Sequence, residues 1–217
     1  MVNDYKLSRA LTKLLRHTAP KRNLNLDIHG GVLISDIIKL PEFNKVNINL
    51  DTFKRIVKEC PKQRFSIYQN LKNNEIAYRI CANQAHSFNV IPKNYNIITL
   101  NNFNKLKINP NTVVHGTYYS NLNKIKKNGL SRMSRTHIHF GVNIPEHGEV
   151  ISGMRTSCEI VIYINIKKAI LDGYEFILSK NRVILCTGNE FGFLPSTYIN
   201  CIKDRKSGKL LGMVSLA

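Results

Sequence analysis

The sequence predicts an α+β protein made of two lobes, and three observations lead to that prediction. The first 90 residues alternate between helical and strand-like patterns. Residues 91–110 are polar and contain two prolines, which is typical of a linker. Residues 111–217 hold short apolar runs broken by glycine, which are typical of strands. We therefore expect an N-terminal lobe over 1–90, a linker over 91–110 and a strand-rich C-terminal lobe over 111–217.

The N-terminal lobe begins with apolar residues at helical spacing. Leu7, Leu11 and Leu14 share one face of the predicted helix, and Pro20 lies beyond its end. Arg16 and His17 would then lie in its last turn, where cationic side chains suit the helix dipole.

Further elements complete this lobe. We expect a strand over 24–28 and a helix through Leu40 that Ser35 caps. A further helix, capped by Asn49 or Asp51, should stop before Pro61, and hairpin strands should follow over 65–68 and 76–80. Helix, short strand, two helices and hairpin is the layout of a winged helix. Such a module often binds nucleic acid, and it also occurs as a plain protein-contact domain.

The C-terminal lobe is expected to be built mainly of strands. Apolar runs predict them at 113–114, 138–140, 160–166, 174–178 and 183–186. One helix is expected over 122–127, with Gly129 as its C-cap.

Composition narrows the classes of protein that this chain can belong to. Hydrophobic residues make up 43% of the chain, enough for a core, and the apolar runs are too short to cross a bilayer. The N-terminus shows no secretory signal pattern. The five cysteines are scattered and include no Cys-x-x-Cys pair, which argues against a disulfide framework. We expect an intracellular protein, cytoplasmic or nuclear, that does not bind membranes.

The charge points to a polyanionic partner. Thirty-two basic residues against fourteen acidic ones give a net charge of +18. The excess is spread along the chain, since residues 1–90 contain 15 basic and 7 acidic residues. An excess of this size favours polyanions through counterion release, without saying which polyanion is bound.

Clusters of polar residues in the N-terminal lobe could carry chemistry. Arg16-His17 could equally be a solvated helix end, and Arg64 an ordinary surface arginine. The cluster Asn83-Gln84-Ala85-His86-Ser87 follows the second hairpin strand. An ordinary surface loop would account for the polarity of this cluster. Side chains that surround and bind an oxyanion would account for it equally well.

The C-terminal lobe has clusters of its own. His115-Gly116-Thr117 follows an apolar pair, and Arg155 adds a guanidinium group. Arg135, His137 and His139 would share one face of a strand. Two histidines at that spacing could hold a metal, but no third ligand stands nearby in the sequence. The sequence also lacks the glycine-rich phosphate-binding loops, so phosphate binding would depend on side chains.

The order of these clusters along the chain is a stronger signal than any one of them. In that order the sequence resembles the NAD-dependent RNA 2′-phosphotransferase family, whose members remove the splice-junction 2′-phosphate left by tRNA ligation. The matching segments are residues 7–17, 62–65, 82–87, 115–117, 133–139, 153–155, 172–173, 179–181, Gly188 and 194–195.

The resemblance implies a winged-helix RNA-binding lobe followed by an ADP-ribosyltransferase-like lobe that holds NAD+. The implied catalytic residues are Arg16, His17, Arg64 and Arg135. The implied RNA phosphate-binding residues are Asn83, Gln84, His86 and Ser87. The implied cofactor-binding residues are His115, Gly116, Thr117, His137, His139 and Arg155. No metal is expected, the partners are 2′-phosphorylated RNA and NAD+, and the protein is expected to be a monomer.

The family's reaction has two steps. The RNA 2′-phosphate attacks C1″ of the nicotinamide ribose and releases nicotinamide, which gives a 2′-phospho-ADP-ribosylated RNA. The ribose O2″ then attacks the phosphorus, which frees the RNA 2′-hydroxyl and yields ADP-ribose 1″,2″-cyclic phosphate. The arginines would clamp the phosphate, and His17 would pass a proton to the departing 2′-oxygen or take one from O2″. Three of the four residues belong to the first lobe and Arg135 to the second, so we expect the active site in a cleft between them.

Some positions depart from the family pattern, and other functions stay open. Ala85 stands where glycine is expected, Cys81 where many members carry arginine, and Gly31 where an aromatic residue is frequent. The alternatives are ADP-ribosylation of terminal phosphates on RNA or DNA, and a non-catalytic winged-helix protein that binds nucleic acid. A zinc hydrolase built on His137 and His139 is a more distant alternative.

Overall fold

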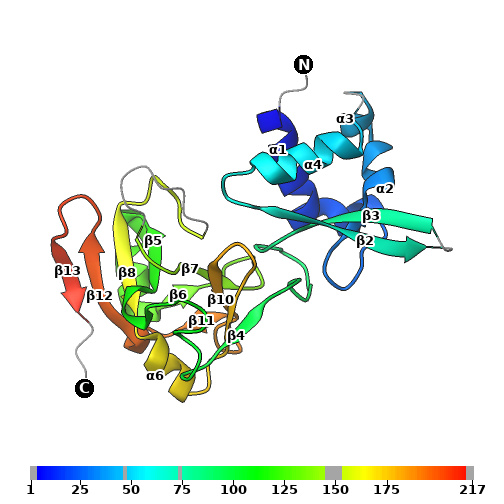
Figure 1. Cartoon of the computed structure of the whole chain (residues 1–217). Coiled ribbons are helices and arrows are strands. Elements are labelled where there is room, and N and C mark those ends of the chain that lie inside the picture. The colour runs from blue at the N-terminus through cyan, green and yellow to red at the C-terminus, as the bar shows by residue number, and fades with distance from the viewer. Residues whose placement is uncertain (1–3, 46–47, 73–74, 145–152, 214–217) are drawn as a thin grey trace. The chain divides into compact units, whose positions relative to one another are not determined.

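The computed structural model describes residues 4–45, 48–72, 75–144 and 153–213. The chain divides into two compact units, a first unit over residues 1–93 and a second unit over 94–217. The first unit combines helices with a small sheet, and the second is built around a larger antiparallel sheet (Figure 1). The predicted α+β class is therefore confirmed. Among the described residues, no helix is long and apolar enough to span a membrane.

The first unit packs its helices on a three-stranded sheet. In chain order its elements are α1 (Asp4–Lys13), η1 (Leu14–Thr18), η2 (Ala19–Arg22), β1 (Val32–Leu33), α2 (Ile34–Ile38), α3 (Pro41–Asn44), α4 (Leu50–Glu59), β2 (Phe65–Lys72) and β3 (Glu75–Ala82). The strand order is β1-β3-β2, and both pairings are antiparallel. Leu11 and Leu15 join Phe43, Phe53 and Ile80 in one core, and all five are fully buried.

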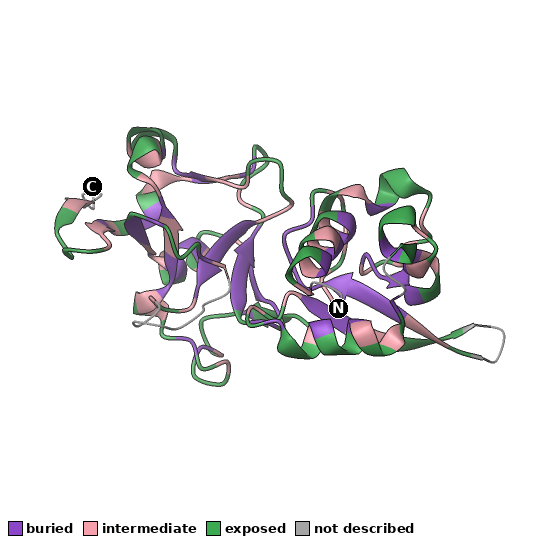
Figure 2. Cartoon of the chain, turned by 90° about the horizontal axis from the view of Figure 1, so that it is seen from above, coloured by how far each residue is buried: buried purple, intermediate pink, exposed green. Residues whose placement is uncertain are grey.

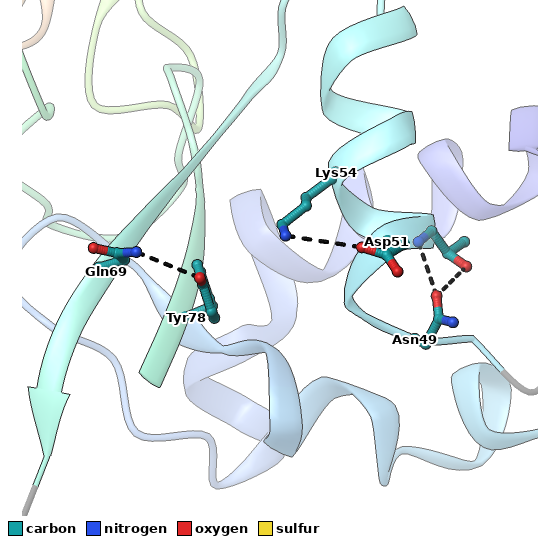
Figure 3. A network of polar contacts seen from close by, with 6 residues as sticks. Asn49, Asp51, Lys54, Gln69 and Tyr78 are labelled. Carbon is teal, nitrogen blue, oxygen red and sulfur yellow. Dashed lines mark hydrogen bonds and ion pairs between the residues drawn. The ribbon is translucent and has the colours of Figure 1, made fainter. Parts of the chain in front are cut away.

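The start of α4 is set by Asn49, one of the two caps that the sequence allowed. The Oδ1 atom of Asn49 accepts hydrogen bonds from the backbone amide and the hydroxyl of Thr52, each at 3.0 Å (Figure 3). Asp51 instead lies in the first turn of α4, where its Oδ1 atom is 3.8 Å from Nζ of Lys54. The cap satisfies one of the amide groups that have no partner inside the helix.

The end of α1 differs from the prediction. The α-helix stops at Lys13, and residues 14–18 continue as the π-helix η1. Arg16 and His17 therefore lie in a π-helical turn rather than in the last turn of an α-helix. Such turns are rare and concentrate at functional sites, because the wider turn changes the direction in which side chains point.

The second unit is dominated by an eight-stranded antiparallel sheet. Its elements are β4 (Asn96–Ile98), η3 (Pro110–Thr112), β5 (Val114–Thr117), η4 (Tyr119–Asn121), α5 (Leu122–Asn128), β6 (Leu130–Ser131), β7 (Ile138–Gly141), β8 (Ile160–Ile164), α6 (Ile166–Leu171), β9 (Phe176–Leu178), β10 (Val183–Cys186), β11 (Phe193–Leu194), η5 (Ser196–Tyr198), β12 (Ile199–Asp204) and β13 (Leu210–Met213). The strand order is β13-β12-β8-β5-β7-β10-β9-β4. A separate two-stranded sheet pairs β11 with β6.

The central strands of this sheet are buried, which explains their continuous apolar sequences. Every residue of β7 and β10 is buried, and in β8 only Tyr163 is partly exposed. Purple stretches in Figure 2 mark the buried parts of the chain, strands among them. Continuous apolar runs are expected where both faces of a strand are covered. The predicted helix at 122–127 is confirmed as α5, with Gly129 at its C-cap at a φ of 83°.

Other local expectations differ from the structure. The expected strand at 24–28 reduces to a single bridge between Leu26 and Val32. Ser35 lies inside α2 and not at its cap, since Leu33 occupies the N-cap position. The run expected as one strand over 160–166 ends at Ile164, where Asn165 caps α6. Residues 96–98, within the expected linker, form the edge strand β4.

Candidate active site

A short loop in the first unit connects the two segments that carry predicted catalytic residues. This loop, residues 83–87, follows β3. At its start the backbone amide of Asn83 donates to the carbonyl oxygen of Arg64 at 2.8 Å, and at its end the amide of Ser87 donates to the carbonyl of Arg16 at 2.9 Å. The loop therefore holds η1 and the start of β2 by main-chain bonds.

His17 is tied to the same loop. Its Nδ1 atom lies 3.2 Å from the hydroxyl oxygen of Ser87. That hydroxyl also lies within donating distance of the Arg16 carbonyl, at 3.3 Å. A serine hydroxyl that donates to a carbonyl can accept from a ring N–H, so the contact favours the tautomer with the proton on Nδ1. Both His17 and Ser87 are exposed, so the imidazole is accessible to a ligand.

The four predicted phosphate-binding residues differ in how they are placed. Asn83 is buried and uses its side chain internally, because Oδ1 accepts from the Ser66 hydroxyl at 2.6 Å and Nδ2 donates to the Gln63 carbonyl at 2.6 Å. Gln84 and His86 are also buried, and only Ser87 is exposed. The geometry thus gives Asn83 a clear role in holding the loop against the strand that begins at Phe65.

Ala85 takes a backbone conformation that glycine adopts most easily. Its φ is 70°, in the left-handed region, and its side chain is buried. A non-glycine residue in this region is strained by the contact of its Cβ with the backbone. The departure from the family pattern noted at this position therefore has a conformational cost, and the loop keeps its bonds to Arg16 and Arg64 despite it.

Arg64 is held by the turn that precedes it. The thiol sulfur of Cys60 lies 3.4 Å from both the backbone nitrogen and the Nη1 atom of Arg64, and it accepts from each. Lys62 lies in the same turn, and burial together with the nearby Arg64 lowers its pKa. The two cations make this turn electropositive, which suits an anionic ligand.

The second unit contains a pocket of about 360 Å³, within the size range of small-molecule sites. It gathers all six residues predicted to bind the cofactor and the predicted catalytic Arg135. The described residues that line it are His115, Gly116, Thr117, Tyr118, Asn121, Ser131, Arg132, Met133, Ser134, Arg135, His137, Ile138, His139, Gly153 and Arg155. Three of these are arginine and three histidine, and none is Asp or Glu.

Burial and mutual repulsion set the charge state of this pocket. Burial lowers the pKa of His115, whose Nδ1 donates to the His139 carbonyl at 2.8 Å. Burial also lowers the pKa of His137, to which Arg132 contributes, and that of Arg135, to which Arg155 contributes. The lowered pKa values favour the neutral form of His115 and His137 at pH 7, whereas the arginines keep their charge.

Gly116 allows the close packing of the pocket floor. A Cβ at this position would lie only 2.4 Å from the sulfur of Met154 and 2.8 Å from that of Cys158. No side chain fits there without displacing them. His115 and Thr117 can thus point to the pocket from β5 while residues 154 and 158 pack beneath it.

The prediction that Arg135, His137 and His139 share one face of a strand is only partly correct. The strand β7 begins at Ile138, so Arg135 and His137 lie in the preceding bend. All three nevertheless line the pocket. Over the described ranges, no group of three or more His, Cys, Asp or Glu side chains could hold a metal ion.

Five polar residues of the pocket were not among those predicted to bind the cofactor, namely Ser131, Ser134, Tyr118, Asn121 and Arg132, and the contacts of the last three show how they are held. Tyr118 bonds to the Ser157 hydroxyl at 2.8 Å, and the Arg155 guanidinium lies 5.9 Å from its ring centre. Asn121 donates to Thr117 Oγ1 at 3.0 Å. The third, Arg132, donates to the Arg135 carbonyl at 2.7 Å. Tyr118 directly follows the motif segment 115–117, and Arg132 directly precedes the segment 133–139. Their positions in the sequence could therefore have indicated them.

Comparisons with known proteins identify the family. A family model described as RNA 2′-phosphotransferase, Tpt1/KptA family, matches residues 2–188. The tRNA 2′-phosphotransferase 1 of Danio rerio is 35% identical over 91% of this chain and 84% of its own length. The Homo sapiens protein of the same name is 36% identical over 97% of this chain and 80% of its own length. A probable RNA 2′-phosphotransferase of Fusobacterium nucleatum is 31% identical, over 92% and 99% of the two chains. This chain therefore belongs to the RNA 2′-phosphotransferase family, Tpt1/KptA.

Proposed function

We propose that this protein removes the splice-junction 2′-phosphate from ligated tRNA and transfers it to NAD+. The products would be the RNA with a free 2′-hydroxyl, nicotinamide and ADP-ribose 1″,2″-cyclic phosphate. The first unit would be a winged-helix RNA-binding lobe and the second an ADP-ribosyltransferase-like lobe, and the protein would act as a monomer without a metal.

One observation carries this proposal: the pocket of the second unit, which is lined by arginine and histidine side chains. Its described lining contains three arginines and three histidines and no carboxylate. A pocket with that lining repels cations and favours a ligand that carries several negative charges. A dinucleotide with a pyrophosphate group has this character.

The shape of the pocket also suits a dinucleotide. Its volume of about 360 Å³ lies within the range of small-molecule sites. Arg132 and Arg155 offer guanidinium forks that match phosphate geometry. Bound NAD+ would supply an electrophilic ribose carbon and a neutral leaving group, while the residues of the pocket hold and orient it.

Residues of the first unit would act on the RNA phosphate. Arg16 and Arg64 flank the loop of residues 83–87, and their guanidinium groups would neutralise the phosphoryl oxygens. His17 is exposed, and its contact with Ser87 favours the proton on Nδ1, so Nε2 would be the atom that faces the substrate and exchanges the proton. Arg135, the fourth residue of the implied catalytic set, lines the pocket of the second unit.

The experiment that tests the proposal uses the purified protein and an oligonucleotide with one internal 2′-phosphate, with and without NAD+. We expect dephosphorylated RNA and ADP-ribose 1″,2″-cyclic phosphate only when NAD+ is present. A reaction that stops at an ADP-ribosylated RNA end would instead indicate modification of terminal phosphates. No product of any kind, and no release of nicotinamide, would contradict an enzymatic function.

A further inference from the structure

We propose that the exposed face of α1 binds the single-stranded RNA that flanks the 2′-phosphate. This RNA track consists of Tyr5, Lys6, Arg9 and Lys13, and the inference rests on the proposed function. Nothing in the proposed reaction uses these four side chains, and they lie on the helix that leads directly into η1, the segment of Arg16 and His17.

The helical period places the track on one side of α1. Lys6, Arg9 and Lys13 follow the spacing i, i+3 and i+7, which aligns side chains along one face. All three are exposed. The apolar face is formed by Leu7 and Leu11, which are buried in the core of the first unit. The helix is thus anchored by one face and presents the basic one to solvent.

The helix α1 carries more basic residues than acidic ones, so the track gives it a net positive charge. The one acidic residue of α1 is Asp4, and its Oδ1 atom lies 2.9 Å from Nη2 of Arg55 on α4. Lys6, Arg9 and Lys13 are therefore exposed on a helix with a net positive charge, which suits an anionic ligand. Cations arranged along a line suit a polyanion with regularly spaced charges.

An exposed aromatic ring makes the track more specific than a basic patch. Tyr5 is 70% exposed, and the guanidinium of Arg9 lies 5.8 Å from its ring centre. An exposed ring beside cations is the combination by which proteins bind single-stranded nucleic acid, because bases stack on the ring while cations follow the backbone. The track therefore fits a single strand with unstacked bases better than a duplex.

The length of the track sets how much RNA it can contact. Tyr5 and Lys13 are eight positions apart, about 12 Å along an α-helix. This corresponds to about three stacked nucleotides at the spacing of one nucleic-acid strand. A substrate that carries only one nucleotide on each side of the 2′-phosphate would be too short to follow the helix from η1 to Tyr5.

Two substrates that differ only in length test the inference. One is a trinucleotide with a central 2′-phosphate, and the other has the same centre with several unpaired nucleotides added on both sides. The track variant is Lys6→Gln, Arg9→Gln and Lys13→Gln combined. Its matched control is Lys124→Gln, Lys127→Gln and Lys167→Gln, which neutralises three exposed helix lysines of the second unit. Tyr5→Ala is compared with Tyr5→Phe, which keeps the ring.

We expect the wild type to show a higher kcat/KM on the long substrate than on the short one, and the track variant to lose this preference. Tyr5→Ala should weaken binding of the long RNA about fivefold or more, and Tyr5→Phe should not. For the long RNA without its phosphate, the slope of log Kd against log salt should fall by about two in the track variant, close to 0.7 for each lost charge.

The inference is overturned if the track variant binds the long RNA with the wild-type Kd and salt slope, or if the control variant weakens binding equally. It is also overturned if Tyr5→Phe loses as much as Tyr5→Ala. A wild-type protein that binds the long RNA through the track but removes no 2′-phosphate would contradict the proposed function and leave the binding surface established.

Discussion

The hydroxyl of Ser87 lies 3.2 Å from Nδ1 of His17, although the two residues are 70 positions apart in the chain. The amide of Ser87 also donates to the carbonyl of Arg16. The end of one loop therefore fixes both the backbone and the imidazole of the π-helical turn. With Nδ1 held by Ser87, the proposed exchange of a proton would fall to Nε2.

Ser87→Ala should slow dephosphorylation by about tenfold, because a proton-transferring histidine loses the group that orients its ring. The effect should lie in kcat and not in the KM for RNA, and the pH profile should shift with it. Steady-state rates across pH check this. Ser87→Thr, which keeps the hydroxyl, serves as the control and should recover most of the rate. Equal loss in both variants would mean that the hydroxyl does not orient His17.

His17→Ala should change which species is seen during the reaction. If the imidazole acts in the second step, the variant should accumulate ADP-ribosylated RNA while release of the cyclic phosphate slows by about two orders of magnitude or more. Gel separation of labelled RNA over time gives both quantities. If His17→Ala reacts at the wild-type rate and accumulates no ADP-ribosylated RNA, His17 has no role in the reaction.

Arg64→Ala should reduce dephosphorylation by at least about a hundredfold, because a charge stabiliser held in place is lost from the phosphate site. Arg22→Ala is the matched control, since it removes an exposed arginine of the same unit whose partner is Glu42. Turnover with the 2′-phosphorylated oligonucleotide is measured for both, and thermal unfolding verifies that each variant is folded. Near-wild-type turnover in Arg64→Ala would contradict its assigned role.

The elements that were predictable from sequence are those whose pattern follows from local burial. The hairpin of β2 and β3, the buried strands β7 and β10, and α5 with Gly129 at its end all follow from apolar periodicity and capping. The π-helix at Arg16 was not predictable, because its residues fit an α-helical pattern equally well. The edge strand β4 was missed because it is only three residues long, its N-terminal neighbours are polar, and its pairing partner β9 lies about 80 residues further on.

The same limit applies to the candidate sites. Motif segments identified the residues that line the pocket, since His115, Arg135 and Arg155 come together in the structure as a group. The internal use of the Asn83 side chain could not be predicted, because its partners Ser66 and Gln63 are defined only by the fold. A polar side chain in a loop has the same appearance in sequence whether it binds a ligand or its own backbone.

The protein should become less stable as the pH falls through the ordinary histidine value of 6.5. Burial lowers the pKa of His115 in the folded state, so near this pH the unfolded chain binds more protons than the folded one. The free energy of unfolding must then rise with pH across this range. Urea unfolding between about pH 5 and pH 8 measures it. His115→Gln, which keeps an N–H donor, should flatten the dependence, and an unchanged slope would contradict the assignment.

Ala85→Gly should stabilise the protein, although most glycine substitutions destabilise. Ala85 has a φ of 70°, a conformation that costs an alanine about 1 kcal/mol or more and costs glycine little. The greater freedom of glycine in the unfolded chain offsets part of that gain, which leaves a net increase of about 0.5 kcal/mol in the free energy of unfolding. Ala10→Gly is the matched control: Ala10 lies inside α1, where glycine should destabilise by about 1 kcal/mol. The two variants should therefore move the urea midpoint in opposite directions, and a shift of the same sign in both would show that Ala85 is not strained.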